Sequence, residues 1–141
     1  MGKYIAEQTI KELIKAEVAV KGSKVLIMGF AFKENVKDVR NTRVIDIYNE
    51  LKEYGVRPFI YDPKVDKEEV QLEYGINIIE KPADFSPYDG IIVAVKHDEF
   101  KVLPVEYLLS LCSNSNPVII DVKGIFDKDS VRLAGFRYWR P

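Results

Sequence analysis

Apolar and amphipathic segments alternate along the chain from residue 24 onward. Four segments are rich in apolar residues and are typical of buried strands: 24–30, 57–62, 90–96 and 117–122. Three amphipathic segments between them predict helices: 43–54, 66–75 and 103–112. Two weaker segments, 76–79 and 135–141, predict short strands. This alternation predicts the α/β class, as a Rossmann-like three-layer αβα sandwich with a mostly parallel sheet.

The first 22 residues predict a helix that precedes the first strand. Its apolar positions recur at helical spacing and form a narrow stripe: Ile10, Leu13, Ile14 and Val18. Gly22 is expected to end this helix, which would then be roughly 30 Å long. Such a helix suits the end of a long connecting or dimer-packing helix. The pattern therefore divides the chain into residues 1–22, a connecting helix, and residues 23–141, a domain.

Composition excludes several classes of protein. A 141-residue chain with 47% hydrophobic residues suits one folded domain rather than a disordered chain. A formal net charge of −1 gives no reason to expect a nucleic acid or an anionic membrane as partner. The chain has no apolar run of about 20 residues and no secretory signal, so we expect a cytoplasmic protein.

The single cysteine and the single histidine limit the possible chemistry. One cysteine cannot form an intrachain disulfide or a cysteine zinc cluster, and one histidine excludes a histidine-rich metal site. Cys112 lies in an apolar helical pattern, which favours a buried core residue over a nucleophile. We therefore expect no metal site.

The turn after the first strand, residues 29–42, is the most unusual loop. In parallel sheets ligands bind at the carboxyl ends of the strands, and a dinucleotide turn needs three glycines there. This turn has Gly29 alone, with Phe30 and Phe32 where glycines would leave room for a pyrophosphate. A self-sufficient NAD site at this turn is therefore not expected.

The same turn offers side-chain cations beside the start of a helix. Lys33, Lys37 and Arg40 could bind a phosphate group there. The alternative is a solvated loop whose Arg40 pairs with Asp38 or Asp62, and spacing alone slightly favours that alternative.

The loops after the other strands add one candidate cation and two candidate structural residues. Asp62 precedes a proline, which favours a turn cap over a ribose-binding acid. His97 could be a general base, but a lone histidine without a nucleophile favours a turn or cap residue. Lys123, followed by Gly124, could place a second cation on an anionic ligand. The residue types together indicate an anion-binding module without a catalytic constellation.

Residues 29–42, GFAFKENVKDVRNT, closely resemble a motif of the UDP-glucose/GDP-mannose dehydrogenase family, G-x-[AT]-F-K-x-[ND]-x-x-D-x-R-x-[ST]. The later strand ends VKHDEF and IIDVKGIFD follow in the family's order, and residues 1–10 resemble the end of its long central helix. The resemblance covers essentially the whole chain. It implies the C-terminal domain, which holds the nucleotide part of a UDP-sugar, in an enzyme that dimerises through the central helix.

Family members oxidise C6 of a nucleotide sugar from alcohol to carboxylate with two NAD⁺. Carried over by position, Phe32 and Lys33 match the family's Phe-Lys pair, with Lys33 on the substrate diphosphate, and Arg40 matches an arginine directed at NAD. Lys123 and Gly124 lie where the family often has two basic residues, so the match there is looser. The sequence more resembles the UDP-N-acetylglucosamine or galactosamine dehydrogenases of surface polysaccharide synthesis than the glucose enzymes.

The family's catalytic motif, G-F-G-G-x-C-x-P-K-D, does not occur in this chain, and Cys112 does not match it. The NAD fingerprint is also missing, so NAD would be bound mainly by an N-terminal domain outside this sequence. We therefore expect no catalytic residue here and no turnover by the isolated chain. Two alternatives remain at this point: a stand-alone nucleotide-binding or regulatory module, and a dimerisation domain with a vestigial pocket.

Overall fold

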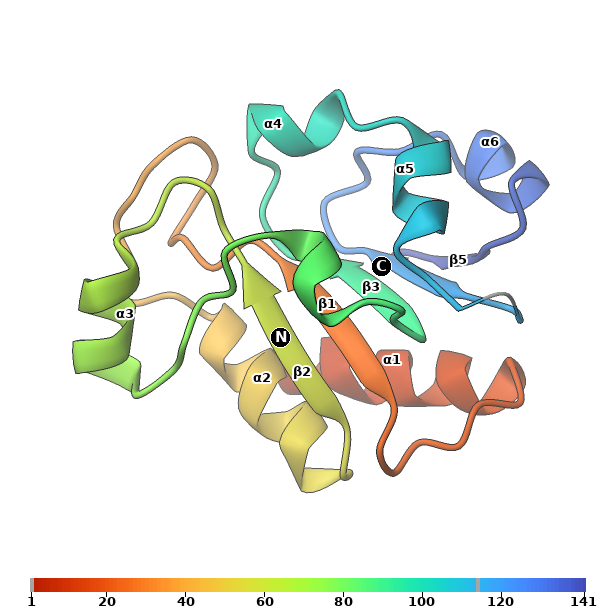
Figure 1. Cartoon of the computed structure of the whole chain (residues 1–141), viewed down its shortest axis with the longest axis horizontal. Coiled ribbons are helices and arrows are strands. Elements are labelled where there is room, and N and C mark those ends of the chain that lie inside the picture. The colour runs from red at the N-terminus through yellow and green to blue at the C-terminus, as the bar shows by residue number, and fades with distance from the viewer. Residues whose placement is uncertain (1, 114) are drawn as a thin grey trace.

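The computed structural model describes residues 2–113 and 115–141 and contains, within them, one sheet of five parallel strands (Figure 1). The strand order is β2-β1-β3-β4-β5. The strands are β1 (Lys24–Met28), β2 (Arg57–Tyr61), β3 (Gly90–Val93), β4 (Val118–Asp121) and β5 (Arg137–Trp139). The predicted parallel sheet is confirmed, and every pairing in it is parallel.

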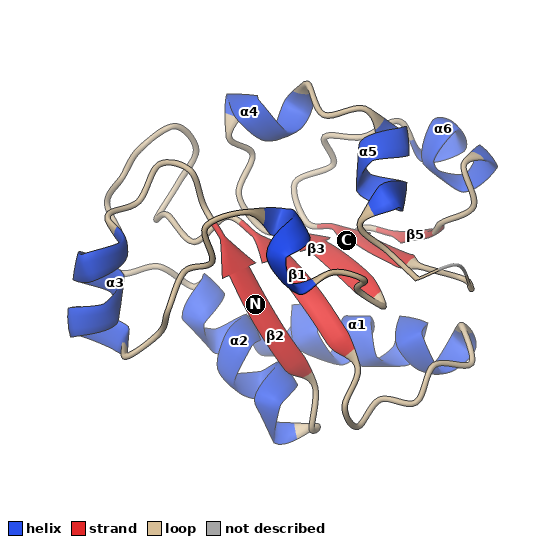
Figure 2. Cartoon of the chain, viewed as in Figure 1, coloured by secondary structure: helices blue, strands red, loops and turns tan. Residues whose placement is uncertain are grey.

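Helices cover both faces of the sheet, which confirms the predicted three-layer α/β architecture (Figure 2). On one face lie α1 (Gly2–Lys15) and α2 (Val44–Glu53). On the other lie η1 (Pro82–Phe85), a 3₁₀ turn, and the short helices α4 (Asp98–Lys101), α5 (Val105–Ser110) and α6 (Lys128–Leu133). The remaining helix, α3 (Lys67–Tyr74), lies beyond the edge strand β2.

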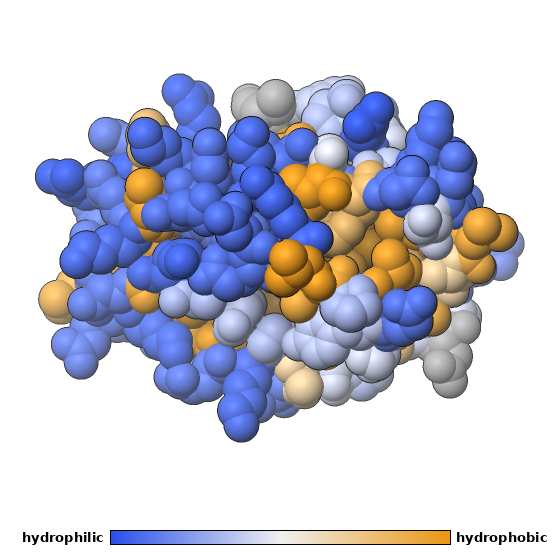
Figure 3. Space-filling model, turned by 90° about the horizontal axis from the view of Figure 1, so that it is seen from above, coloured by the Kyte–Doolittle hydropathy of each residue, from blue (hydrophilic) through white to orange (hydrophobic). Residues whose placement is uncertain are grey.

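The central strands are buried on both sides because their side chains alternate between two cores. Val25 and Ile27 of β1 pack toward α1 and α2, whereas Leu26 and Met28 pack toward α5 and α6. The layer of short helices leaves some apolar surface uncovered, since Phe85, Val102 and Leu133 are exposed. Viewed from that side, apolar side chains lie between hydrophilic ones (Figure 3).

The first helix is shorter than its apolar pattern predicts. It ends at Lys15 instead of Gly22, so it is about 21 Å long. Glu17 adopts a left-handed φ of 62°, and the Val18 and Glu17 amides donate to the carbonyls of Leu13 and Ile14. These two bonds form a Schellman motif, which closes a helix and is usually built on glycine.

Other elements also differ in extent from the sequence-based expectation. Residues 76–79 form only an isolated bridge, between Ile60 and Ile78, rather than a strand. The helices α4 and α6 and the turn η1 were not predicted, because segments of four to six residues are too short to show helical periodicity.

The strand order places a crevice at the carboxyl edge of the sheet. The chain passes from β1 to β2 on one side, and from β3 to β4 on the other, so the loops after β1 and β3 diverge. Such a topological switch point is where open α/β sheets bind ligands. Gly29 turns the chain out of β1 here, with a φ of 103°, and a Cβ on it would lie 2.6 Å from the Cβ of Val95.

Candidate functional site

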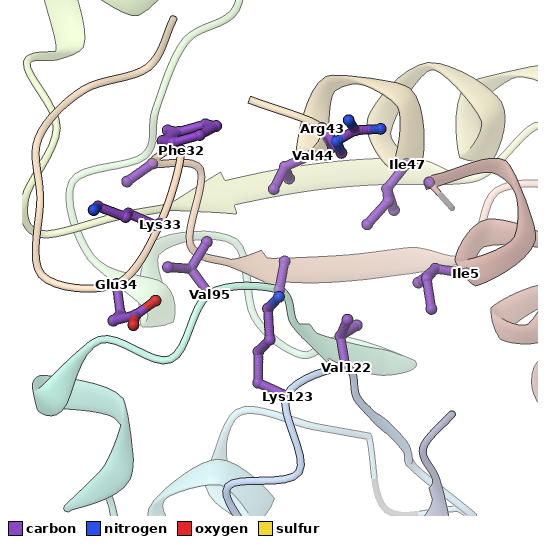
Figure 4. A pocket seen from close by; sticks show the side chains of 13 residues that line it. Ile5, Phe32, Lys33, Glu34, Arg43, Val44, Ile47, Val95, Val122 and Lys123 are labelled. Atoms are coloured by element: carbon purple, nitrogen blue, oxygen red, sulfur yellow. The ribbon is translucent and has the colours of Figure 1, made fainter. Parts of the chain in front are cut away.

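A pocket of about 170 Å³ lies at this switch point (Figure 4). Its apolar walls come from α1, the start of α2 and the loops after β3 and β4: Ile5, Val44, Ile47, Ala94, Val95 and Val122. Its polar lining comes from the loop between β1 and α2 (residues 29–43, the β1–α2 loop) and the loop after β4: Lys33, Glu34, Arg43 and Lys123.

The pocket brings together three of the residues that the sequence singled out. Phe32 and Lys33 come from the β1–α2 loop, and Lys123 comes from the loop after β4. Phe32 is 51% exposed although it is a large apolar residue. Lys123 extends into the pocket, whereas Lys33 lies at its rim (Figure 4). An aromatic face and two cations therefore share one concave site, although some 90 residues separate the two lysines in the sequence.

The mouth of the pocket is locally cationic although the chain carries a formal net charge of −1. The pKa of Glu34 lies below its ordinary value. A hydrogen bond from its own backbone amide lowers it most, and the nearby charges of Lys96, Lys33 and Lys123 lower it further. Because three ammonium groups act on one carboxylate, the same surface favours other anions.

Sequence reasoning missed three of the polar residues near this site. Arg43 lines the pocket from the position immediately before α2. The first amide of that helix, on Val44, donates to Thr42 Oγ1 (3.2 Å). Glu34 and Lys96 were not singled out either. The sequence did contain a signal in the positions of two of them. Glu34 is next to Lys33, and Lys96 follows β3 at the edge of the sheet where ligands bind.

Arg40 and Gly124 lie outside the pocket lining. The Arg40 side chain is 73% exposed, and its Nε lies 3.1 Å from Oδ1 of Asp38. Asp38 is one of the two partners that the solvated-loop alternative expects. This hydrogen bond also lowers the pKa of Asp38. Gly124 has a φ of 65° and lies beside the Arg140 guanidinium.

Phe30 does not share the surroundings of Phe32. Its side chain is fully buried, and its ring packs edge-on against Tyr74 with 5.2 Å between the ring centroids. Tyr74 in turn donates its hydroxyl to the carbonyl of Val39 (2.5 Å). Phe30 therefore fixes the start of the β1–α2 loop in the core, while Phe32 faces the pocket.

Asp62 and His97 are buried structural residues next to the pocket. Asp62 accepts hydrogen bonds from the backbone amides of Phe30, Ala31 and Lys64, which confirms the predicted turn cap. His97 immediately precedes α4, is fully buried and uses both ring nitrogens within the protein. Burial raises the pKa of Asp62, but the bonds from His97, Phe30 and Lys64 outweigh burial and lower it overall.

Cys112 is unsuited to nucleophilic chemistry. Burial raises the pKa of its thiol to about 12, so the reactive thiolate is scarce at neutral pH. Within residues 2–113 and 115–141, no three His, Cys, Asp or Glu side chains are grouped so as to hold a metal ion. None of the helices described is long and apolar enough to cross a membrane.

Comparison with known proteins relates this geometry to a family. A sequence model of the UDP-glucose/GDP-mannose dehydrogenase family, UDP binding domain, matches residues 26–128. The UDP-N-acetyl-D-glucosamine 6-dehydrogenase of Pseudomonas aeruginosa is 42% identical over 133 residues, which are 94% of this chain and 31% of that protein. Protein CapL of Staphylococcus aureus is 36% identical over 140 residues, 99% of this chain and 32% of that protein.

A solved structure gives the same result. The NDP-N-acetyl-D-galactosaminuronic acid dehydrogenase of Methanosarcina mazei Go1 superposes with a TM-score of 0.89 at 25% identity, over 99% of this chain and 29% of that one. The chain thus spans about a third of the length of the relatives that it matches. It belongs to the UDP-glucose/GDP-mannose dehydrogenase family and corresponds to that family's C-terminal, UDP-binding domain.

Proposed function

We propose that this chain holds the nucleotide diphosphate of a UDP-sugar within an NAD-dependent UDP-sugar 6-dehydrogenase. The observation that carries the proposal is the pocket at the β1/β3 switch point, where Phe32, Lys33 and Lys123 meet in a domain of the UDP-binding family. The cations would bind the diphosphate, and Phe32 would contact the nucleotide or the sugar. The UDP-N-acetylhexosamines are the proposed substrates, because the relatives named above include a UDP-N-acetyl-D-glucosamine 6-dehydrogenase.

The size of the pocket supports a shared site. At about 170 Å³ it is smaller than the ~300–1,000 Å³ typical of complete small-molecule pockets. We propose that this chain supplies one wall and that the part of the enzyme outside this sequence supplies the rest, together with the NAD site and the catalytic cysteine. The isolated chain would then bind substrate weakly and oxidise none.

Arg40 fits a role toward the cofactor in that arrangement. Its side chain is exposed and held by one surface ion pair with Asp38. Solvent-exposed ion pairs contribute little to stability, so Arg40 can exchange Asp38 for a phosphate of NAD at small cost. Gly124 would let the loop after β4 approach the nucleotide.

Residues 1–22 are proposed to end the central helix, and residues 23–141 to form the UDP-sugar-binding unit. In the structure α1 packs on α2, and its other side exposes Tyr4 and Ile14. We propose that this exposed side faces a second subunit in a homodimer.

Ligand-dependent stability tests the proposed site. At a hundredfold excess over Kd, UDP should raise the free energy of unfolding of the wild-type chain by about 2.7 kcal/mol, measured as a shift in Tm. Lys33→Ala should weaken UDP binding about tenfold or more, because a charged hydrogen bond is lost. Lys37→Ala is the matched control, since Lys37 is exposed on the same loop but outside the pocket lining. A wild-type chain that UDP fails to stabilise would overturn the proposal.

A further inference from the structure

The β1–α2 loop, which carries Phe32 and Lys33, begins on a buried carboxylate. Oδ2 of Asp62 accepts the backbone N–H groups of Phe30 (2.7 Å) and Ala31 (3.0 Å). Oδ1 of the same residue accepts the N–H of Lys64 (2.8 Å). Asp62 is only 1% exposed, so these bonds have no competition from bulk water. The residue that follows β2 thus fixes how the chain leaves β1.

His97 connects this carboxylate to the far side of the same loop. Its Nε2 lies 3.0 Å from Oδ2 of Asp62, and its Nδ1 lies 2.9 Å from the backbone nitrogen of Asn35. A backbone N–H can only donate, so Nδ1 must be the acceptor, and Nε2 carries the proton and donates a hydrogen bond to Oδ2 of Asp62. The contacts therefore define one neutral tautomer of a fully buried imidazole.

Asn35 is held a second time, from the start of α4. Its side-chain oxygen accepts the backbone N–H of Asp98 (3.0 Å), and its φ of 60° turns the loop back. Lys33 consequently lies midway along the sequence between Ala31 and Asn35, whose backbone amides are held by Asp62 and His97. Three strand ends, those of β1, β2 and β3, meet in the hydrogen bonds that determine where the Lys33 backbone lies.

We propose that His97 is a positioning residue for the nucleotide-diphosphate site: oriented by Asp62, its Nδ1 holds Asn35 and so keeps Lys33 at the rim of the pocket. This inference rests on the proposed function, since it assigns Lys33 to the diphosphate. The proposal gives the two ring nitrogens of His97 different roles. Nε2 secures the ring in the core, and Nδ1 controls the ligand-binding loop.

Two substitutions at His97 separate these roles. Asn carries its side-chain oxygen on Cγ, as His carries Nδ1, so His97→Asn retains an acceptor for Asn35 and loses the bond to Asp62. Gln carries its amide nitrogen one atom further out, as His carries Nε2, so His97→Gln retains the bond to Asp62 and loses the acceptor. We expect His97→Gln to bind UDP about tenfold more weakly than wild type, and His97→Asn to remain within about threefold.

The measurements are UDP titrations and hydrogen exchange of the Asn35 amide, both followed by NMR on the 141-residue chain. The Asn35 amide should be protected in wild type and in His97→Asn, and should exchange faster in His97→Gln. If both variants lose stability and yet bind UDP as wild type does, His97 is merely structural and the inference is overturned. If wild type itself does not bind UDP, the proposed function fails, and the exchange of the Asn35 amide still decides whether His97 holds the loop.

A second pair of variants, at the exposed residue Asn35, tests the same loop if His97→Gln does not fold. Asn35 is exposed and has a left-handed backbone, so Asn35→Gly keeps the conformation and the amide bond to His97. Both variants lose the side-chain hydrogen bond to Asp98, and Asn35→Ala in addition strains the left-handed backbone. We expect Asn35→Ala to weaken UDP binding more than Asn35→Gly. Equal, wild-type affinity in both variants would contradict the inference.

Discussion

At the scale of single residues, two buried aspartates organise the edge of the sheet where the pocket lies. Asp62 follows β2, and Asp121 ends β4; both are almost completely buried. Asp121 accepts the backbone amides of Ile125 and Phe126 and the hydroxyl of Tyr138 (2.7 Å). Burying a carboxylate is costly unless its oxygens are satisfied. Here loop amides satisfy each carboxylate, and the carboxylates in turn accept the hydrogen bonds that fix those loops.

Replacing Asp62 by Asn should therefore destabilise the chain. One oxygen would become an NH₂ group that faces donors, and the free energy of unfolding should fall by about 2–4 kcal/mol. Asp66→Asn is the matched control, because Asp66 caps α3 on the surface and Asn caps helices equally well. Urea unfolding followed by circular dichroism measures both. An Asp62→Asn variant as stable as the control would contradict the role assigned to Asp62.

The lowered pKa of Asp62 also predicts how stability depends on pH. The folded state holds this carboxylate ionised to a lower pH than the unfolded state, whose pKa is about 3.9. Its contribution is therefore complete above about pH 5 and is lost as the pH falls through the folded pKa. Urea midpoints measured from pH 7 to pH 3 should decline less steeply in Asp62→Asn than in wild type. Parallel declines would show that Asp62 does not contribute to acid unfolding.

At the scale of elements, α1 is an integral part of the layer that it shares with α2. Leu13 is completely buried in the core beneath both helices. Glu12 is also buried, and its carboxylate lies 3.3 Å from Nη2 of Arg137 in β5. The helix is thus attached to the sheet by apolar packing and by an ion pair that links it to the far edge strand.

Truncating the buried side of α1 should cost far more than truncating its exposed side. Leu13→Ala should lower the free energy of unfolding by about 2–5 kcal/mol, since it removes buried methyl groups and leaves a cavity. Ile14→Ala, at a position 60% exposed on the same helix, should change it by less than about 0.5 kcal/mol when both variants are measured as monomers of the 141-residue chain. Denaturant midpoints of the two variants give the comparison. Similar losses in both would mean that α1 is not packed as described.

How far the elements could be predicted depends on their length and on what ends them. The apolar segments located the central strands within one to three residues, because strands buried on both faces leave a strong signal. The end of α1 was misplaced because Glu17, rather than a glycine, takes the left-handed position that closes the helix. The short helices α4 and α6 depend on their surroundings in the fold, which no periodic pattern records.

At the scale of the whole molecule, the central strands belong to both cores at once. Ile92 of β3 packs with the α1 and α2 side, whereas Ile91 and Val93 pack with the α5 and α6 side. Loss of packing in one core would therefore expose the strands that also form the other core. A sheet shared in this way should couple the two layers into one cooperative unit.

This coupling predicts a single unfolding transition. Trp139, the only tryptophan in the chain, lies in the edge strand β5 and reports on its packing through fluorescence. Far-UV circular dichroism reports mainly on the helices. The two urea transitions should coincide in midpoint and slope. A Trp139 transition at lower urea than the helical one would show that β5 and its neighbours unfold first.

The site as an assembly was only partly predictable from the sequence. A parallel sheet places all carboxyl ends at one edge, and for that reason Lys33 and Lys123 could be expected near each other. The strand order, which places the crevice between β1 and β3, is not contained in the apolar pattern. The contributions of Ile5 and Arg43 depend on how α1 and α2 pack, so they emerge only in the folded chain.

Gly29 is constrained in a different way from the lysines that line the pocket. Its backbone adopts a φ of 103°, and any side chain there would collide with Val95 in the loop after β3. A random screen for variants that fail to bind ligand would thus recover Gly29 among misfolded proteins, whereas Lys33 and Lys123 could be recovered as folded proteins. Recognition in this domain can therefore diverge through the side chains that line the pocket, while the turn that carries Lys33 out of β1 is constrained by the requirement to fold.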